Sequence, residues 1–287
     1  MMKKLSFIFF TLLSFLDKII IFLTKKSFLI RLNDFIQERS YKSIKVLNRK
    51  IKFFTPNQIV DWRVDTFFSK EPETLEWIDN FEKDKKLIFW DIGANIGLYS
   101  IYNSIKNDNS LTFAFEPSSS NLRTLTRNVY INNLQKKIMI IPIPLTNKEN
   151  IFQEMREGKF IEGGALNTFG EKYNFEGKEF EPKMKYFLLG TTINFLLNNS
   201  ILEIPDYVKI DVDGIEHLII EGGNKFLDNK KIKSFSIEIN ENFKEQAEKV
   251  IKLMKINNFD ILHKKQNNEM SNIKSKFNNT FNYIFVR

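Results

Sequence analysis

The 287-residue chain is predicted to be an α/β protein with a mostly parallel, Rossmann-like sheet and helices on both faces. Short apolar runs such as residues 87–90 and 207–211 alternate with segments of helical periodicity such as 121–132. Runs that are apolar on both faces are typical of strands buried between two helical layers. The composition agrees, because 43% hydrophobic residues supply a sizeable core. The absence of cysteine excludes disulfides and thiolate metal sites.

The first segment, residues 5–23, is almost wholly apolar apart from Asp17 and Lys18. Two central charges argue against a membrane span, and no small-residue cleavage site follows to suit a signal peptide. We expect an apolar helix lying in the plane of a membrane. Two different arrangements stay open, namely burial against the protein's own domain or a partner, and a true anchor. The prediction rests on a narrow polar stripe at helical spacing, made of Thr11, Ser14, Lys18 and Lys25.

The net charge of +8 is concentrated at the N-terminus. Residues 1–60 contain 12 basic and 3 acidic residues, a net +9, whereas residues 61–287 contain 31 and 32, a net −1. The second part therefore gives no reason to expect nucleic acid as a partner. Basic residues flanking an apolar helix are typical of contact with an anionic cytoplasmic leaflet. We expect a cytoplasmic protein at the inner face of the cell membrane.

Three regions follow from this division. Residues 1–30 form the membrane-associated helix, 31–80 a lead-in, and 81–287 the α/β domain. In the lead-in, 44–47 and 51–54 suggest a hairpin, and Pro72 suits the first turn of a helix. Residues 146–200 contain glycines and are expected to be irregular. In the domain we expect strands at 87–90, 111–115, 138–145, 207–211, 234–239 and 279–286, and helices at 96–104, 121–132, 216–226 and 243–256.

Polar residues at the carboxyl ends of the predicted strands indicate the binding site. Ligands of open α/β sheets bind at these ends. The turn Asp91–Gly97 lacks the glycine spacing of a dinucleotide site, and suits a positively charged ligand without phosphates, such as S-adenosylmethionine (SAM). Glu116 ends the next strand, where a carboxylate can accept both ribose hydroxyls, although NAD enzymes use the same arrangement. Further acidic or polar strand ends are Asp211 with Asp213, and Glu238 with Asn240.

Four segments resemble the FkbM-type methyltransferases: DIGANIGLYS (91–100), FEPSSSN (115–121), VKIDVDGIE (208–216) and SIEIN (236–240). The resemblance covers roughly residues 85–287. It implies a class I, SAM-dependent methyltransferase that acts mainly on hydroxyl oxygens of sugars and secondary metabolites. Many relatives have histidine where this chain has Ile215, so a catalytic role for that histidine does not apply. By resemblance, Asp91, Gly93, Asn95 and Gly97 line the methionine part of SAM, Glu116 holds the ribose, and Ser118 and Asn121 lie near the adenosine.

Methylation of an alcohol requires alignment of donor and acceptor and removal of a proton. We expect Asp211 to be the base and Lys209, on the same strand face, to hold it ionised. Glu238 is a further catalytic candidate. The alternative is that Asp211 and Asp213 only bind the SAM amino group or cap the next helix. The residues expected to contact a small-molecule or saccharide hydroxyl acceptor are Asp213, Glu216, Asn240 and Asn167.

The roles of two loops and one histidine remain open. Arg63, Lys70 and Glu71 are either solvated or part of a loop folded over the SAM end of the sheet. Gly164, Asn167 and Thr168 are candidates for an acceptor loop. The histidine, His217, is more often packed or exposed than a base, although it titrates near neutral pH.

Three rival functions also stay open. Asp211-Val212-Asp213 resembles the metal–nucleotide motif of glycosyltransferases, but we expect no metal site. A Rossmann-type NAD-dependent oxidoreductase is the second rival, weakened by the missing dinucleotide glycines. The third is a membrane-attached, non-catalytic protein with a SAM-binding fold.

Overall fold

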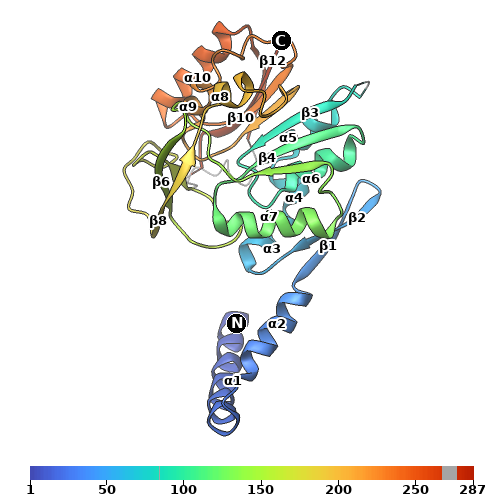
Figure 1. Ribbon diagram of the computed structural model, residues 1–287, viewed down its shortest axis with the longest axis vertical. Coiled ribbons are helices and arrows are strands. Elements are labelled where there is room, and N and C mark those ends of the chain that lie inside the picture. Colours follow the sequence, from blue (N-terminus) through green and yellow to red (C-terminus); the bar gives the residue numbers. More distant parts are fainter. Residues whose placement is uncertain (84, 267–276) are drawn as a thin grey trace.

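A computed structural model describes residues 1–83, 85–266 and 277–287. Its main feature is a seven-stranded sheet with the order β11-β12-β10-β9-β3-β4-β5 (Figure 1). All neighbours from β10 to β5 are parallel, and β12 is antiparallel to both β10 and β11. This confirms the predicted fold class. The strands are β3 (Leu87–Ile92), β4 (Ser110–Phe115), β5 (Ile138–Ile141), β9 (Tyr207–Ile210), β10 (Ser234–Asn240), β11 (Asp260–Lys265) and β12 (Thr280–Val286).

Helices bury both faces of this sheet. Successive side chains of a strand point to opposite faces, so Phe89 and Trp90 of β3 enter different hydrophobic clusters. Both residues are fully buried. The Phe89 cluster includes residues of α5 (Pro72–Asp79), α6 (Leu98–Lys106) and α7 (Ser119–Ile131). The Trp90 cluster includes residues of α8 (Ile193–Asn198), α9 (Glu216–Glu221) and α10 (Lys244–Ile256).

The lead-in packs against the same body. The predicted hairpin is present, with Ile44 opposite Ile51. Phe53 and Phe67 are buried in the Phe89 cluster, and the backbone N–H of Phe54 donates to Asn128 of α7 at 2.8 Å. The predicted domain boundary at residue 80 therefore lies within one continuous core. The lead-in elements are β1 (Tyr41–Val46), β2 (Arg49–Phe54), α3 (Gln58–Asp65) and α4 (Phe67–Lys70).

The segment 146–200 differs from the expectation. Instead of being irregular throughout, it contains a second, antiparallel sheet of order β7-β6-β8. Its strands are β6 (Ile151–Glu157), β7 (Thr168–Phe169) and β8 (Met184–Gly190). The sheet escapes prediction because Arg156 and Glu157 are buried within β6, whereas Phe152 and Phe187 are exposed, the reverse of the usual pattern.

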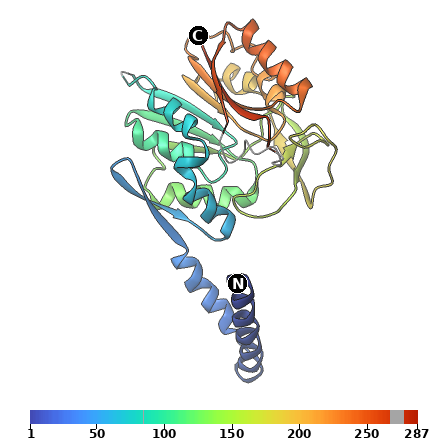
Figure 2. The same cartoon turned by 180° about the vertical axis from the view of Figure 1, so that it is seen from behind.

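The N-terminal region forms a helical hairpin, α1 (Met2–Thr24) followed by α2 (Phe28–Arg39), that protrudes from the body (Figures 1 and 2). By length and composition α1 would suit a membrane span, with a mean hydropathy of 2.1, and 6% of its most apolar window is buried. The structure therefore does not show this helix buried against its own domain. The sequence patterns do not predict α2; its start is capped by Ser27, which accepts from the Ile30 N–H.

Candidate active site

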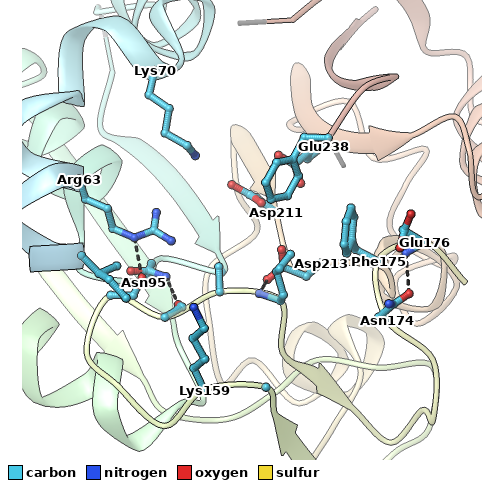
Figure 3. Close-up of a pocket in the computed structure, with 18 of the residues that line it drawn as sticks. Arg63, Lys70, Asn95, Lys159, Asn174, Phe175, Glu176, Asp211, Asp213 and Glu238 are labelled. Atoms are coloured by element: carbon cyan, nitrogen blue, oxygen red, sulfur yellow. Dashed lines mark hydrogen bonds between the residues drawn. The ribbon is translucent and has the colours of Figure 1, made fainter. Parts of the chain in front are cut away.

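The carboxyl ends of β3, β9 and β10 open into a cavity of about 530 Å³. Three carboxylates reach it from the sheet: Asp211 and Asp213 after β9, and Glu238 near the end of β10. Arg63 and Lys70 face them from α3 and α4 (Figure 3). The side chains brought together here come from positions as far apart as residues 63 and 238, so one cavity unites the lead-in with the sheet.

The turn after β3 approaches the end of β9 closely. Gly93 has a φ of 88°, and a Cβ atom built on it would lie 1.9 Å from the carbonyl oxygen of Asp211. Only glycine fits such a close, left-handed position. Gly97, at φ 87°, has a different surrounding, because its Cβ position lies 2.5 Å from Leu125 Cδ1 of α7. Gly93 therefore borders the cavity, and Gly97 allows α6 and α7 to pack closely.

Asp91 lies near the end of β3, opposite Lys209 of β9 in the sheet. It is 1% exposed, and its Oδ2 accepts from Ser100 Oγ at 2.5 Å. Its Oδ1 is buried and has no hydrogen-bond partner within the described residues. Burial raises the pKa of Asp91 although nearby Lys209 acts to lower it.

An ion pair between Lys209 and Asp211 forms the floor of the site. Lys209 Nζ lies 2.6 Å from Asp211 Oδ2, with the lysine side chain 2% and the aspartate side chain 23% exposed. The ammonium also lies 5.0 Å from the centre of the Tyr99 ring. Burial acts to lower the pKa of Lys209, but Asp211 and Glu71 raise it above its usual range. The lysine is thus a fixed cation that keeps one oxygen of Asp211 oriented while the carboxylate still reaches the cavity.

The lead-in completes this charge network. Glu71, 3% exposed, pairs with Lys70 at 2.5 Å and forms a hydrogen bond with the Tyr99 hydroxyl. Burial acts to raise the pKa of Glu71, but Lys70 and Lys209 lower it to about 2. Arg63 Nε donates to the Gly163 carbonyl at 2.7 Å. This segment is therefore folded over the cavity end of the sheet, the second of its two predicted arrangements.

Glu116 receives two backbone N–H groups, from Asn95 and Ser118, each at 2.8 Å. Burial raises the pKa of Glu116 to about 8 despite these hydrogen bonds. The Ser118 Oγ lies 3.0 Å from Ser120 Oγ. Asn121 contacts a neighbouring loop: its Nδ2 donates to the Gly164 carbonyl at 3.1 Å, and its Oδ1 accepts from the Gly163 N–H at 2.9 Å.

Asn95 holds the same loop. Its Nδ2 donates to Gly164 at 2.7 Å, while its Oδ1 is buried without a partner in the described chain. Asn95 lines the cavity together with Gly163 and Gly164. The two asparagines predicted to contact SAM therefore also fasten the loop at the cavity wall.

The four residues expected to contact the methyl acceptor occupy three environments. Asp213 lines the main cavity and accepts from the Leu166 N–H at 2.6 Å; burial, with the charge of Asp211, raises its pKa to about 6. Glu216 is buried beneath the turn, accepting from the N–H groups of Val212 and Gly214. Asn240 donates to the Phe175 carbonyl at 3.0 Å.

The fourth, Asn167, lines a smaller and largely apolar pocket beside Gly93 and Pro117. Thr168 lines this pocket too. His217 is 6% exposed and its ring contacts Phe243, and burial lowers its pKa to about 4. It is a packed, neutral histidine, the more common of its two predicted roles.

Sequence reasoning missed the cavity's aromatic wall and one cation. Their signals are weak: Trp62 precedes the regular pattern, and the others lie in the segment expected to be irregular. Within the described ranges, no group of three acidic or histidine side chains is arranged to hold a metal ion. The missed lining residues include Trp62, Lys159, Phe175 and Phe180.

The sheet order, the glycine turn after β3 and the acidic strand ends define a class I methyltransferase fold. The sequence profile of the methyltransferase FkbM domain matches residues 91–261, more than half of the chain. The chain belongs to the FkbM methyltransferase family, a family of SAM-dependent enzymes.

Similarities to solved structures are more distant. No curated protein matches the sequence significantly. The precorrin-6y C5,15-methyltransferase from Geobacter metallireducens is 15% identical, covering 76% of this chain and 86% of that one, with a TM-score of 0.42. Fibrillarin from Aeropyrum pernix, in complex with natively bound SAM, is 11% identical, covering 86% and 82%, with a TM-score of 0.45. Similarities at this level give no information about the acceptor of this chain.

The residues present suit SAM. Gly93 leaves room where a side chain would overlap the Asp211 carbonyl, and it lines both the main cavity and the small apolar pocket that includes Phe115 and Pro117. Glu116 follows the end of β4, where it is buried and its carboxylate accepts from the Asn95 and Ser118 N–H groups. The buried, unpartnered Oδ1 of Asn95 provides a further acceptor at the turn within the described chain.

Proposed function

We propose that the protein transfers the methyl group of SAM to a hydroxyl oxygen of a sugar, glycan or related metabolite. The observation that carries this proposal is the Lys209–Asp211 ion pair, whose carboxylate reaches a cavity large enough for a small polar acceptor. The proposed methionine-side contacts are Asp91, whose buried Oδ1 has no partner within the described residues, with Gly93 and Asn95. Glu116 would hold the ribose, and Ser118 and Asn121 would lie near the adenosine.

The cavity chemistry favours a hydroxylated acceptor. Asp213 and Glu238 supply hydrogen-bond acceptors, and Lys159 supplies a donor. Trp62, Phe175 and Phe180 supply apolar faces. Sugars combine hydroxyl edges with apolar C–H faces, so alternating carboxylates and aromatic rings suit them.

The reaction needs a proton acceptor near the hydroxyl. When bound, SAM supplies a methyl group that is activated by its sulfonium. On transfer to the hydroxyl oxygen, the S–CH3 bond would break as the O–CH3 bond forms, with S-adenosylhomocysteine as the leaving group. The hydroxyl proton would pass to the Asp211 carboxylate, which Lys209 holds in place at 2.6 Å. Burial and the charge of Asp211 raise the pKa of Glu238 well above its usual range. The raised pKa favours the protonated form of Glu238, which is suited to donate a hydrogen bond to the acceptor.

The test is turnover of methyl-labelled SAM with a panel of saccharide acceptors, combined with calorimetry of SAM and NAD binding. Asp211→Asn should retain SAM binding and lose at least about 100-fold in kcat, because general-base removal typically costs 10²–10⁴-fold. Glu203→Gln, a carboxylate change at an exposed surface pair, is the control and should be unchanged.

Each failure has a distinct meaning. Binding of NAD but not SAM would identify an oxidoreductase. SAM binding without turnover of any acceptor would favour a non-catalytic binding protein. If Asp211→Ala loses SAM binding as well as turnover, Asp211 is a cofactor ligand and not the base.

A further inference from the structure

The helix α1 presents exposed apolar side chains over most of its surface, apart from the polar stripe that contains Thr11, Ser14 and Lys18. Phe7, Phe15 and Phe22 are 68%, 63% and 75% exposed, and they lie on a helix that stands away from the body (Figure 2). A soluble monomer rarely exposes a continuous apolar surface of this extent. Such a surface requires a partner.

The one acidic residue of α1 does not oppose an apolar partner. Asp17 is 6% exposed and faces the start of α2. It accepts from Ser27 Oγ and the Phe28 N–H, both at 2.8 Å. These bonds satisfy backbone and hydroxyl donors at the helix start and fix the hairpin. The charge that argues against membrane contact in the sequence is therefore held inside the hairpin.

The hairpin geometry distinguishes lying on a membrane from crossing it. The helix α1 leads away from the body, and α2 returns to it (Figure 1). If α1 crossed a bilayer, α2 would have to cross back. Its 12 residues rise only about 18 Å, against a hydrocarbon core of about 30 Å, and they include Arg31, Asp34 and Glu38.

The charges around α1 select the partner. Lys3 and Lys4 lie at its start, and Lys25 and Lys26 follow its end. Together with the rest of residues 1–60 they give a net +9. Two copies of this segment would repel each other, whereas an anionic surface would attract it.

We propose that the hairpin binds an anionic lipid bilayer with α1 lying in the membrane plane. Both ends of α1 and the body stay on the same side, at the cytoplasmic leaflet expected from the sequence. The inference is independent of the reaction catalysed.

The test measures binding of the full-length protein to phosphatidylcholine vesicles with and without phosphatidylglycerol. Binding should require the anionic lipid and weaken with salt. Phe15→Glu combined with Phe22→Glu should abolish it. The matched control replaces Phe152 and Phe187, which are 66% and 67% exposed on the second sheet, by glutamate and should bind normally. Lys3→Gln and Lys4→Gln should each weaken binding about fivefold.

A protease-cleavable tag at the N-terminus establishes the topology. On protein-decorated vesicles, the tag should be cleaved by protease added outside, together with the accessible body. Protection of the tag would show that α1 spans the bilayer and would overturn the in-plane arrangement. Absence of vesicle binding, with a dimer in solution that the Phe15/Phe22 change dissociates, would identify a second copy as the partner instead.

Discussion

Gly93 sets the spacing between the turn after β3 and the end of β9. We predict that Gly93→Ala destabilises the fold by about 1–3 kcal/mol, because the added Cβ overlaps the Asp211 carbonyl and the backbone is left-handed. It should also weaken SAM binding, since relief of the overlap moves the turn or Asp211. Chemical denaturation and calorimetry measure the two effects.

Gly158→Ala is the matched control. Gly158 lines the same cavity, but its Cβ position lies 3.7 Å from the nearest atom, the Leu166 carbonyl oxygen. The unfolding free energy of the Gly158→Ala variant should be nearly the same as that of the unchanged protein. Equal stability of the Gly93 and Gly158 variants would refute the close-approach argument.

Asp213 makes the site pH-dependent. Its pKa is raised from 3.8 to about 6 by burial and by Asp211, so the folded state holds this proton more tightly than the unfolded chain. Ionisation of Asp213 therefore lowers the free energy of unfolding. This loss is absent below about pH 4, grows as the pH rises to about 6, and is complete above that value. We predict that Asp213→Asn stabilises the protein at pH 7–8 by up to about 3 kcal/mol, with no gain below pH 4.

The variant keeps the local structure, because asparagine tolerates the φ of 64° at this position and retains an oxygen for the Leu166 N–H. Denaturant unfolding across pH 4–8 measures the effect. The exposed Asp228→Asn is the comparison and should show no such difference. If the unfolding free energies of Asp213→Asn and the unchanged protein differed by the same amount at all pH values, the difference would not come from titration of Asp213.

At the scale of elements, the junction of α4 and α5 belongs to the site. Glu71 balances the buried Lys209 and the neighbouring Lys70. We predict that Glu71→Gln lowers the unfolding free energy by roughly 3 kcal/mol, because removing one member leaves buried charge uncompensated. Turnover should also fall, with KM for SAM less affected. Thermal unfolding and kinetics at pH 7 measure these changes.

Glu76→Gln tests whether any carboxylate of this region has the same effect. Glu76 lies in α5 and pairs with Lys265 at the surface, where its side chain is 62% exposed. We expect little change in stability or turnover. Similar losses in both variants would mean that Glu71 acts through general helix stability and not through the Lys209 network.

The elements that carry the site are largely predictable because their patterns are local. Asp91, Glu116 and Asp211 each end or follow an apolar run, and parallel pairing then brings strand ends together. The network around Glu71 is not predictable in detail, since its partners Tyr99 and Lys209 are distant in sequence.

Two elements escape prediction for physical reasons of their own. The second sheet is missed because buried Arg156 and exposed Phe152 obscure its alternation. The start of α2 depends on Asp17, ten residues before Ser27, in another helix. In both cases the stabilising contacts join positions that no local pattern connects.

At the scale of the whole molecule, charge and packing divide the chain in different places. The basic excess extends through residue 60, but the hydrophobic core already includes Val46 and Phe53 of the lead-in. Within the described part of the chain, the helical hairpin α1–α2 is the basic segment that lies outside the core. The proposed membrane attachment and the proposed catalytic site therefore lie in parts of the chain that share few buried contacts.

This division predicts that removing residues 1–30 leaves the body folded and active in solution. In the removed segment Asp17 is the one buried residue, and its partners Ser27 and Phe28 are removed with it. The contacts of Arg123 and Arg127 with Gln37 at the end of α2 remain. The melting temperature and the kcat for a soluble acceptor should be unchanged, while vesicle binding is lost. A large drop in melting temperature would instead show that the hairpin stabilises the body, so that attachment and folding are not separable.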